Sequence, residues 1–228
     1  MNRIPILCVL AMLTMASDAM AETLTFQNRS LEFEAPPGYC LLDRDDAFQE
    51  GIFEFFVGLQ RSMGAELLAV YAQCDELEEI VARRLDHFIH YGMLMVVPAA
   101  DDVARPVAGG TRDGFIAHMA TVLGWPSGQS ANAIPKINRE IADLGITMTE
   151  LSEPAVIGTD DNALYAAFRS TLENGGAPVS IATIAAYTMV AELPLSNNLT
   201  APAGDDDVLN VLFGIQAALM ADFIAANE

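Results

Sequence analysis

Residues 36 to 46 read PPGYCLLDRDD and combine a turn, a cysteine and an acidic run. Pro36-Pro37-Gly38 stops strand pairing, because proline donates no backbone hydrogen bond and glycine accepts turn conformations. Asp43 and Asp45 follow shortly after, and aspartate caps a helix by accepting hydrogen bonds from its first N–H groups. The stretch therefore predicts a turn, then Cys40, then the start of a helix.

The N-terminus has the three parts of a secretory signal peptide. Arg3 supplies the positive charge, residues 4–16 form an apolar stretch, and Ala19-Met20-Ala21 fits a cleavage site. The apolar stretch is shorter than the roughly 20 residues that a transmembrane helix needs, which disfavours an uncleaved anchor. We expect residues 1–21 to be a signal peptide and residues 22–228 to form a single α+β domain. The mature protein would be periplasmic or secreted, with no stable membrane insertion.

Cleavage would leave Cys40 and Cys74 as the cysteines of the mature chain, because Cys8 lies in the apolar stretch of the leader. An even pair in an exported protein predicts a disulfide bond. The alternatives are a catalytic thiol beside a histidine, a free thiol and a metal-bound thiol. Each cysteine lies between an expected strand and an expected helix, so neighbouring strands would bring both to one edge of a sheet.

Composition and charge narrow the classes of partner. The chain is 52% hydrophobic with a mean hydropathy of +0.31, which is typical of a folded domain. Its formal net charge is −20, and Lys136 is its single lysine. Such a charge repels the phosphates of nucleic acid and disfavours an anionic membrane surface. Solubility or a salty habitat is the ordinary cause of such acidity, and a small cationic ligand or a basic partner protein is the alternative.

Hydrophobic periodicity predicts the elements of the first half of the chain. These are two strands joined by a turn at 27–29, a helix capped by Asp43 or Asp45 and ending at 62, a strand at 65–74, and a helix at 75–92. Asp75 and Glu78 resemble a capping box at the start of that last helix, and Gly92 offers a stop.

The second half of the chain predicts a loop, a helix and a run of strands. We expect a loop at 98–113, a strand at 114–124, a short helix at 130–145 with Pro135 near its first turn, strands at 146–158, 162–172 and 179–192, and a helix at 206–226. Asn210, Gln216 and Asp222 argue against a membrane span in that terminal helix. The expected fold is α+β, a mostly antiparallel sheet flanked by helices in an α/β/α sandwich-like arrangement, with one disulfide.

Three histidines are the weak metal candidates of the mature chain. His87 and His90 lie three residues apart on the expected helix and could share zinc with His118 and a carboxylate. Helical geometry instead places His87 at the border of the apolar stripe and His90 toward the polar face, where histidine is an ordinary surface residue. The acidic clusters lack the spacing of an EF-hand calcium loop. We therefore expect no metal site and no cofactor.

Three residues are candidates for ligand binding. Arg84 falls along the apolar stripe of the expected 75–92 helix, where it would either extend its charge to water or pair with a buried acid near a pocket. Tyr39 and Trp125 sit beside glycine or proline in expected turns. They could line a ligand surface or pack onto the core, and the second is commoner for aromatic residues in loops.

The order of the expected elements resembles that of the Mog1/PsbP-like α/β/α sandwich proteins. The segment LEFEAPPGYCLLD, residues 31–43, is similar to the opening of that group, which has an extended strand, a Pro-Gly-aromatic turn and a second strand. The resemblance covers most of the mature chain and implies an accessory or binding role without a shared catalytic site. The chain departs from the group in its cysteine pair and in its lack of a lipobox.

The sequence therefore favours an exported, non-enzymatic accessory or binding module that acts through a protein partner. A periplasmic protein that binds a small molecule or a cation is the alternative, and a hydrolase is less favoured. No catalytic residue can be chosen, because a nucleophile-elbow serine, a phosphate-binding glycine loop and a dinucleotide fingerprint are all missing from the sequence.

Overall fold

The computed structural model describes residues 21–85, 89–97, 110–123, 129–142, 145–173, 176–204 and 207–228. The strands are β1 Glu22–Phe26, β2 Arg29–Phe33, β3 Tyr39–Leu41, β4 Glu66–Gln73, β5 Tyr91–Val96, β6 Thr147–Leu151, β7 Ala155–Thr159, β8 Leu164–Glu173, β9 Val179–Val190 and β10 Leu193–Pro202. The helices are α1 Ala47–Ser62, α2 Cys74–Val81, α3 Arg112–Leu123, α4 Gln129–Ile141 and α5 Val208–Asn227.

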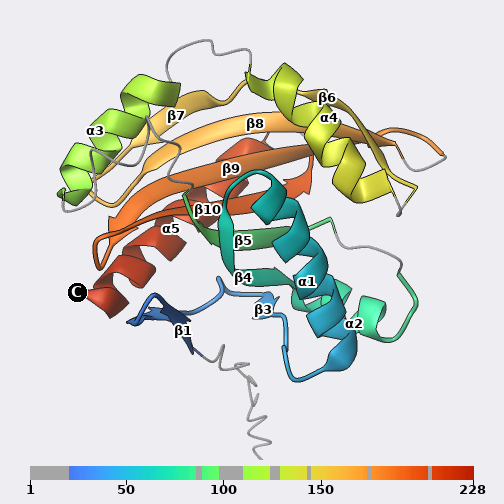
Figure 1. Cartoon of the computed structure of the whole chain (residues 1–228), viewed down its shortest axis with the longest axis horizontal. Coiled ribbons are helices and arrows are strands. Elements are labelled where there is room, and N and C mark those ends of the chain that lie inside the picture. Colours follow the sequence, from blue (N-terminus) through green and yellow to red (C-terminus); the bar gives the residue numbers. More distant parts are fainter. Residues whose placement is uncertain are drawn as a thin grey trace, which may run out of the picture.

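Eight strands form one sheet in the order β3-β4-β5-β10-β9-β8-β6, with β7 paired to the other half of β8 on the same side as β6. The pairs in the described part of the chain are antiparallel. Figure 1 shows α1, α3 and α4 in front of the sheet and α5 behind it. The architecture is therefore the α+β, mostly antiparallel sandwich that the sequence predicts.

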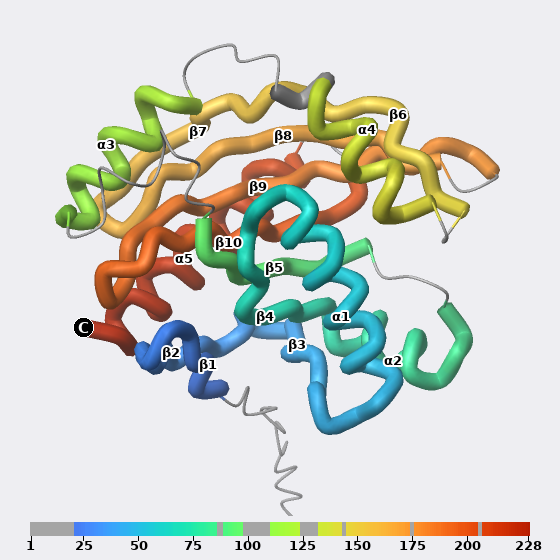
Figure 2. Tube along the Cα trace, viewed as in Figure 1, coloured from blue at the N-terminus to red at the C-terminus, as the bar shows by residue number. Residues whose placement is uncertain are grey.

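The hairpin of β1 and β2 lies outside this sheet and closes through a tight turn. Gln27 and Asn28 have φ values of 47° and 66°, as a two-residue turn between right-twisted strands requires. Figure 2 shows the hairpin beside the C-terminal end of α5. There the Asn227 side chain accepts a hydrogen bond from the Glu32 N–H and donates one to the Glu32 carbonyl, both at 2.8 Å. The two ends of the described chain are thus joined through backbone groups of β2.

One continuous core lies between the sheet, the hairpin and α5. It includes Leu31 and Phe33 of the hairpin, Leu199 of β10, and Leu212 and Met220 of α5, all at most 2% exposed. The buried positions of α5 recur at three- and four-residue steps, so they form one face of the helix. Burial on this scale fixes α5 against the sheet.

A buried polar cluster lies inside that core. Tyr71 of β4 donates a hydrogen bond of 2.6 Å to the Asn197 Oδ1, and Gln216 of α5 donates one of 2.6 Å to the Asn197 carbonyl. Tyr71, Asn197 and Gln216 are each 0% exposed. Burial raises the pKa of Tyr71, and the bond to Asn197 opposes that effect. Buried polar groups are costly unless they are paired, so this cluster specifies where α5 sits.

The opposite face of the sheet has two smaller cores. Phe53 and Phe56 of α1 pack with Val70 of β4 in one of them. Phe115 and Met119 of α3 form the second with residues from the ends of the central strands. Helices α1 and α3 cover different cores, so this face is stabilised in parts.

The disulfide between Cys40 and Cys74 is present, as the sequence predicts, with a Cα–Cα distance of 5.0 Å. Cys40 lies in β3, and Cys74 begins α2 directly after β4. Because β3 and β4 are paired neighbours, both cysteines reach the same edge. Closing a loop of 34 residues stabilises the folded state by about 3.8 kcal/mol in the chain-entropy model.

The expected helix at 75–92 is wrong in its length, because α2 ends at Val81. Arg83 has a φ of 57°, a left-handed conformation that stops a helix. Gly92 does not end a helix but lies in β5 opposite Tyr71. A Cβ on Gly92 would lie 2.0 Å from the Tyr71 ring, so glycine lets that ring cover the strand.

Three further expectations differ from the structure. The segment expected as a strand at 114–124 is helix α3, and the strand expected at 146–158 is two strands, β6 and β7, separated at 152–154. Strand β10 was not expected at all. A short apolar run is compatible with either a helix or a strand, and packing of Phe115 and Met119 on the sheet decides for the helix.

Two details of the helices also differ. Asp46 caps α1, accepting hydrogen bonds from the N–H groups of Phe48 and Gln49, instead of Asp43 or Asp45. Pro135 lies inside α4, beyond its first turn. Both corrections shift an element boundary and leave the element itself in place.

Candidate interaction site at the β7 edge

Strand β7 forms part of the outer rim of the sheet. Its residues pair with β8 from Ala155 opposite Ala167 to Thr159 opposite Leu164. No other strand of the described chain pairs with it, so the other side of its backbone is unpaired within the sheet. Figure 1 shows β7 along this rim, next to α3. We call this side of the strand the β7 edge.

The β7 edge carries exposed apolar side chains. Val156 is 40% exposed and Ile157 is 45% exposed, two of the most exposed large apolar residues in the described part of the chain. A bulge between Val156 and Gly158 places Ile157 outside the regular pairing with β8. An edge strand without charge or proline in its own span is open to pairing with another chain.

The turn after β7 is rigid. The Asp160 Oδ1 accepts hydrogen bonds of 2.8 Å from the N–H groups of Asn162 and Ala163, which is the geometry of an aspartate turn. Its Oδ2 accepts one of 2.9 Å from the Tyr165 hydroxyl. Burial raises the pKa of Tyr165, and the Asp160 carboxylate raises it further. Asp160 therefore stabilises the turn between β7 and β8.

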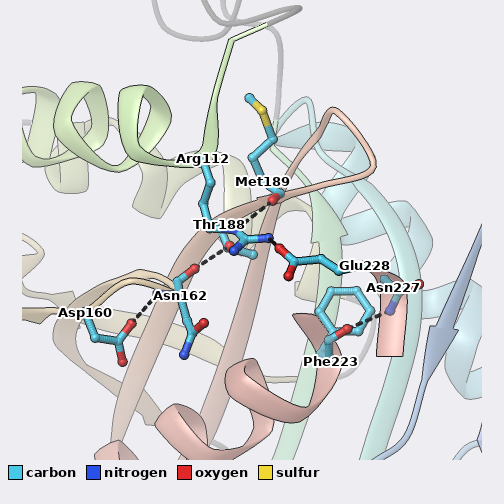
Figure 3. Close-up of polar contacts among 8 residues, drawn as sticks. All are labelled: Arg112, Asp160, Asn162, Thr188, Met189, Phe223, Asn227 and Glu228. Carbon is cyan, nitrogen blue, oxygen red and sulfur yellow. Dashed lines mark hydrogen bonds and ion pairs between the residues drawn. The ribbon is translucent and has the colours of Figure 1, made fainter. Parts of the chain in front are cut away.

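This turn is also tied to the next strands of the sheet. Figure 3 shows the Thr188 hydroxyl donating a hydrogen bond to the Asn162 carbonyl, at 2.6 Å. Beside it, Arg112 of α3 donates to the Met189 carbonyl at 3.2 Å and pairs with the Glu228 carboxylate at 2.5 Å. Arg112 thereby connects α3, on one face of the sheet, to the end of α5 on the other face. The end of β7 is held in place before any partner binds.

Acidic residues flank the β7 edge at both ends. Glu153 precedes the strand and Asp161 follows it, and both are exposed. Glu150 adds a third exposed carboxylate on β6, while Arg169 of β8 is the nearby cation. The local field is therefore negative, in keeping with the net charge of −20.

The structure places Arg84 away from any apolar stripe, which corrects the sequence prediction. Helix α2 has already ended, and the Arg84 side chain is 63% exposed. Its guanidinium binds both carboxylate oxygens of Glu79 at 2.6 and 2.7 Å. This pair raises the pKa of Arg84 and lowers that of Glu79. A role of Arg84 in binding stays a prediction.

The aromatic candidates also separate. Tyr39 is 6% exposed and packs edge-to-face on Tyr71, with ring centroids 5.7 Å apart, so it belongs to the core. Trp125 lies outside the described residues. The structure therefore does not bring together Tyr39 and Arg84, the two binding candidates that it describes: the first is in the core and the second is exposed.

Of the metal candidates, His90 has a carboxylate partner. Its Nδ1 lies 2.5 Å from the Glu76 Oε1, and the Glu76 Oε2 accepts hydrogen bonds from the N–H groups of Ile89 and His90. Glu76 thus anchors the start of β5. Within the described ranges, no three His, Cys, Asp or Glu side chains are grouped as metal ligands. His118 is half-buried on α3, and His87 lies outside the described residues.

Helix α5 is long and apolar enough to cross a membrane, and it is the one such helix in the described ranges. Its mean hydropathy is 1.8. The core helix of a water-soluble protein meets the same criteria, and here the inner face of α5 packs on the sheet with Gln216 bonded to Asn197. This packing accounts for the apolar residues on the inner face of α5.

Comparison with known proteins adds no relative. No protein-family model matches the chain. No curated protein is significantly similar to it. The resemblance to the Mog1/PsbP-like proteins therefore stays a prediction.

Sequence reasoning missed the β7 edge. The residues of β7 were expected within one long strand, and alternation indicates a strand without indicating its neighbours. The signal that could have found it is Ser152-Glu153-Pro154, because proline interrupts pairing and favours a strand at the rim of a sheet.

Proposed function

We propose that the protein is an exported, non-enzymatic accessory module that binds a protein partner through the β7 edge. The observation that carries this proposal is a strand with an unpaired side and two exposed apolar residues, Val156 and Ile157. An extended segment of a partner adds to such an edge as a further strand, with backbone hydrogen bonds giving affinity and side chains giving specificity.

The chemistry of the site indicates the kind of segment that binds. Val156 and Ile157 favour apolar side chains in the partner, and the acids at either end of β7 favour basic ones. The strand has five residues, and each net hydrogen bond contributes about 0.5–1.5 kcal/mol, so the pairing alone is weak and reversible. An apolar and basic extended segment therefore fits this edge.

A second copy of this chain fits less well than a different protein. Two copies related by two-fold symmetry would pair their β7 strands antiparallel. That arrangement sets Glu153 of one copy near Asp161 of the other, at both ends of the contact. Like charges facing each other across paired strands are destabilising. The partner is thus a basic protein of another kind.

The cysteine pair supports the proposed compartment. Disulfides persist in the periplasm and outside the cell, and they are rare in a reducing cytosol. Cys40 and Cys74 form one in this protein, in agreement with the signal peptide expected at residues 1–21. With both sulfurs bonded, neither provides the thiolate that a cysteine-dependent enzyme needs.

Photo-crosslinking in the native envelope tests the proposal. A photoreactive phenylalanine analogue replaces Ile157 in one strain and Val81 in another, because Val81 is exposed to a similar degree (42%) but lies on α2. We expect a discrete protein adduct from position 157 and none from position 81. The same adduct from both positions, or none from position 157, contradicts the proposal.

A charge substitution sharpens the result. Val156→Lys places a cation on the strand and repels a basic segment, whereas Val81→Lys adds the same charge elsewhere. We expect the first to abolish the adduct from position 157 and the second to leave it unchanged. Equal adduct yields in the two variants would exclude β7 as the binding strand.

A further inference from the structure

A groove lies on the α5 face of the sheet, where β6, β8 and β9 extend past the helix. Its volume is about 480 Å³, within the range of 300–1,000 Å³ for small-molecule clefts. Its lining includes the side chains of Glu150, Ser152, Arg169, Thr171, Ser180 and Ala203. This groove goes beyond the β7 edge and does not depend on it.

The groove exists because the sheet carries small side chains just beyond the part that α5 covers. Tyr165 and Ala167 on β8 pack under α5. Arg169 and Thr171 continue the same face by the two-residue alternation of a strand. The floor there is formed by Ser180 and Ala203, whose backbones are joined by a hydrogen bond of 2.8 Å. Short side chains at this end of the sheet leave room for a ligand.

One wall of the groove is a row of oxygen atoms. The Thr171 hydroxyl lies 3.2 Å from the Glu150 carboxylate and 3.3 Å from the Ser180 hydroxyl. These residues come from three neighbouring strands, with Glu150 and Ser180 each paired opposite Thr171. Side chains on paired strands are held in place by the sheet, so the row is fixed before a ligand arrives.

Arg169 supplies a cation beside this row. Its backbone is fixed by Ser152, which donates its N–H to the Arg169 carbonyl at 2.8 Å and accepts the Arg169 N–H at 2.9 Å. The structure shows no hydrogen bond or ion pair of the Arg169 guanidinium with a described residue. Arginine binds carboxylates through two parallel hydrogen bonds, so this side chain is suited to a ligand carboxylate.

The spacing and the charge decide between classes of ligand. Arg169 and Glu150 occupy diagonal positions on paired strands, where the two residues are about 7–8 Å apart and their side chains lie on the same face of the sheet. A small molecule with a carboxylate and an ammonium group can contact both side chains at once, with its carboxylate on Arg169 and its ammonium group on Glu150. A net anion is repelled by a protein of charge −20, whereas a zwitterion is not.

We propose that this groove binds a free α-amino acid, with its carboxylate on Arg169 and its ammonium group between Glu150 and the hydroxyls of Thr171 and Ser180. The amino acid side chain points out of the open groove, so selectivity among neutral and basic amino acids is low. Acidic amino acids bind more weakly, because their net negative charge is repelled by the net charge of −20 on the protein.

Titration of the isotopically labelled protein tests this proposal by NMR. The probes are L-alanine, its methyl ester, which lacks the carboxylate, and N-acetyl-L-alanine, which lacks the ammonium group. Each is added up to about 10 mM, ten times a millimolar Kd. We expect L-alanine to shift the amide signals of Thr171 and Ser180 in a saturable way, and each half-ligand to bind at least tenfold more weakly. No saturable shift with L-alanine, or equal binding of a half-ligand, overturns the proposal.

Variants of Arg169 distinguish a loss of ligand binding from a loss of folding. Arg169→Gln should weaken L-alanine binding at least tenfold, and Arg169→Lys should lie between it and the native protein, because lysine keeps the charge but loses the paired hydrogen bonds. Arg139→Gln removes an exposed arginine of α4 outside the groove and should leave binding unchanged. Equal binding by the Arg169→Gln and Arg139→Gln proteins, with both still folded by their thermal transitions, contradicts the assignment.

Discussion

On the α5 face of the sheet, one helix and the N-terminal hairpin share a continuous core, whereas on the opposite face separate helices cover two smaller cores. Phe33 shows the difference in one residue. Its ring contacts Tyr71 of the sheet and Phe223 of α5, with centroids 5.7 and 5.6 Å away. Phe115, equally buried, belongs to the core under α3 alone.

Stability is therefore distributed differently on the two faces of the sheet. A substitution that leaves a cavity in the continuous core should destabilise the hairpin, the central strands and α5 together. A cavity in the core under α3 should destabilise only α3 and the strand ends below it. Both proposed sites lie outside these cores. The groove uses the end of the α5 face that the helix leaves uncovered, and the β7 edge lies at the rim of the sheet.

The largest expected effect comes from truncating the two phenylalanines. Phe33→Ala and Phe115→Ala each remove a fully buried ring, at a cost of about 3–5 kcal/mol of unfolding free energy. Chemical denaturation measures the cost, and amide hydrogen exchange shows where it falls. We expect Phe33→Ala to accelerate exchange in β2, β10 and α5, and Phe115→Ala to accelerate it in α3 and the strand ends below it but not in β2 or α5. Identical exchange patterns would refute the division into one large and two small cores.

A smaller effect is expected where the Tyr71 ring covers β5. Gly92→Ala puts a Cβ 2.0 Å from the Tyr71 ring, which is packed in the continuous core and cannot move away. We expect a loss of about 1–3 kcal/mol in the unfolding free energy. Gly58→Ala is the matched control, because nothing lies within 4 Å of that position on α1, and it should stabilise by about 0.5–1 kcal/mol. Similar losses for both variants would show that crowding at Tyr71 is not the cause.

The smallest effect concerns Arg112, which joins the two faces. Arg112→Ala removes the ion pair with Glu228 and the hydrogen bond to Met189, at an expected cost of about 0.5–1 kcal/mol. Hydrogen exchange should rise at the C-terminal end of α5 and at the start of α3. Arg44→Ala, which breaks the exposed pair with Glu50, should leave both regions unchanged. No difference between the two variants would mean that the faces are stabilised independently.

Elements with strong local signals could be predicted from the sequence. The hairpin, α1, β4 and α5 follow from periodicity and turn residues, and the disulfide follows from cysteine parity. Prediction failed where tertiary packing decides. The helical pattern of 75–92 continues past Arg83, but the chain turns there, and Tyr91–Val96 gains more by pairing with β4 and β10.

The candidate sites could not be predicted, because each depends on strand order. Glu150, Arg169 and Ser180 are distant in sequence and meet only when β6, β8 and β9 are neighbours. The exposure of Ile157 depends on β7 being at the rim. Arg84 illustrates the reverse case, because its predicted place on an apolar stripe requires a helix that continues past residue 84, and α2 ends at Val81.

Hydrogen exchange of β7 in the partner-bound protein shows whether a partner adds a strand at the β7 edge. The partner captured by crosslinking at position 157 is purified and bound to the native protein, and exchange is compared with that of the free chain. We predict slower exchange in Ala155–Thr159, because a new strand pairs with its outward N–H groups, and no change in α2. Unchanged exchange in β7, with protection elsewhere on the surface, would contradict strand addition at this edge.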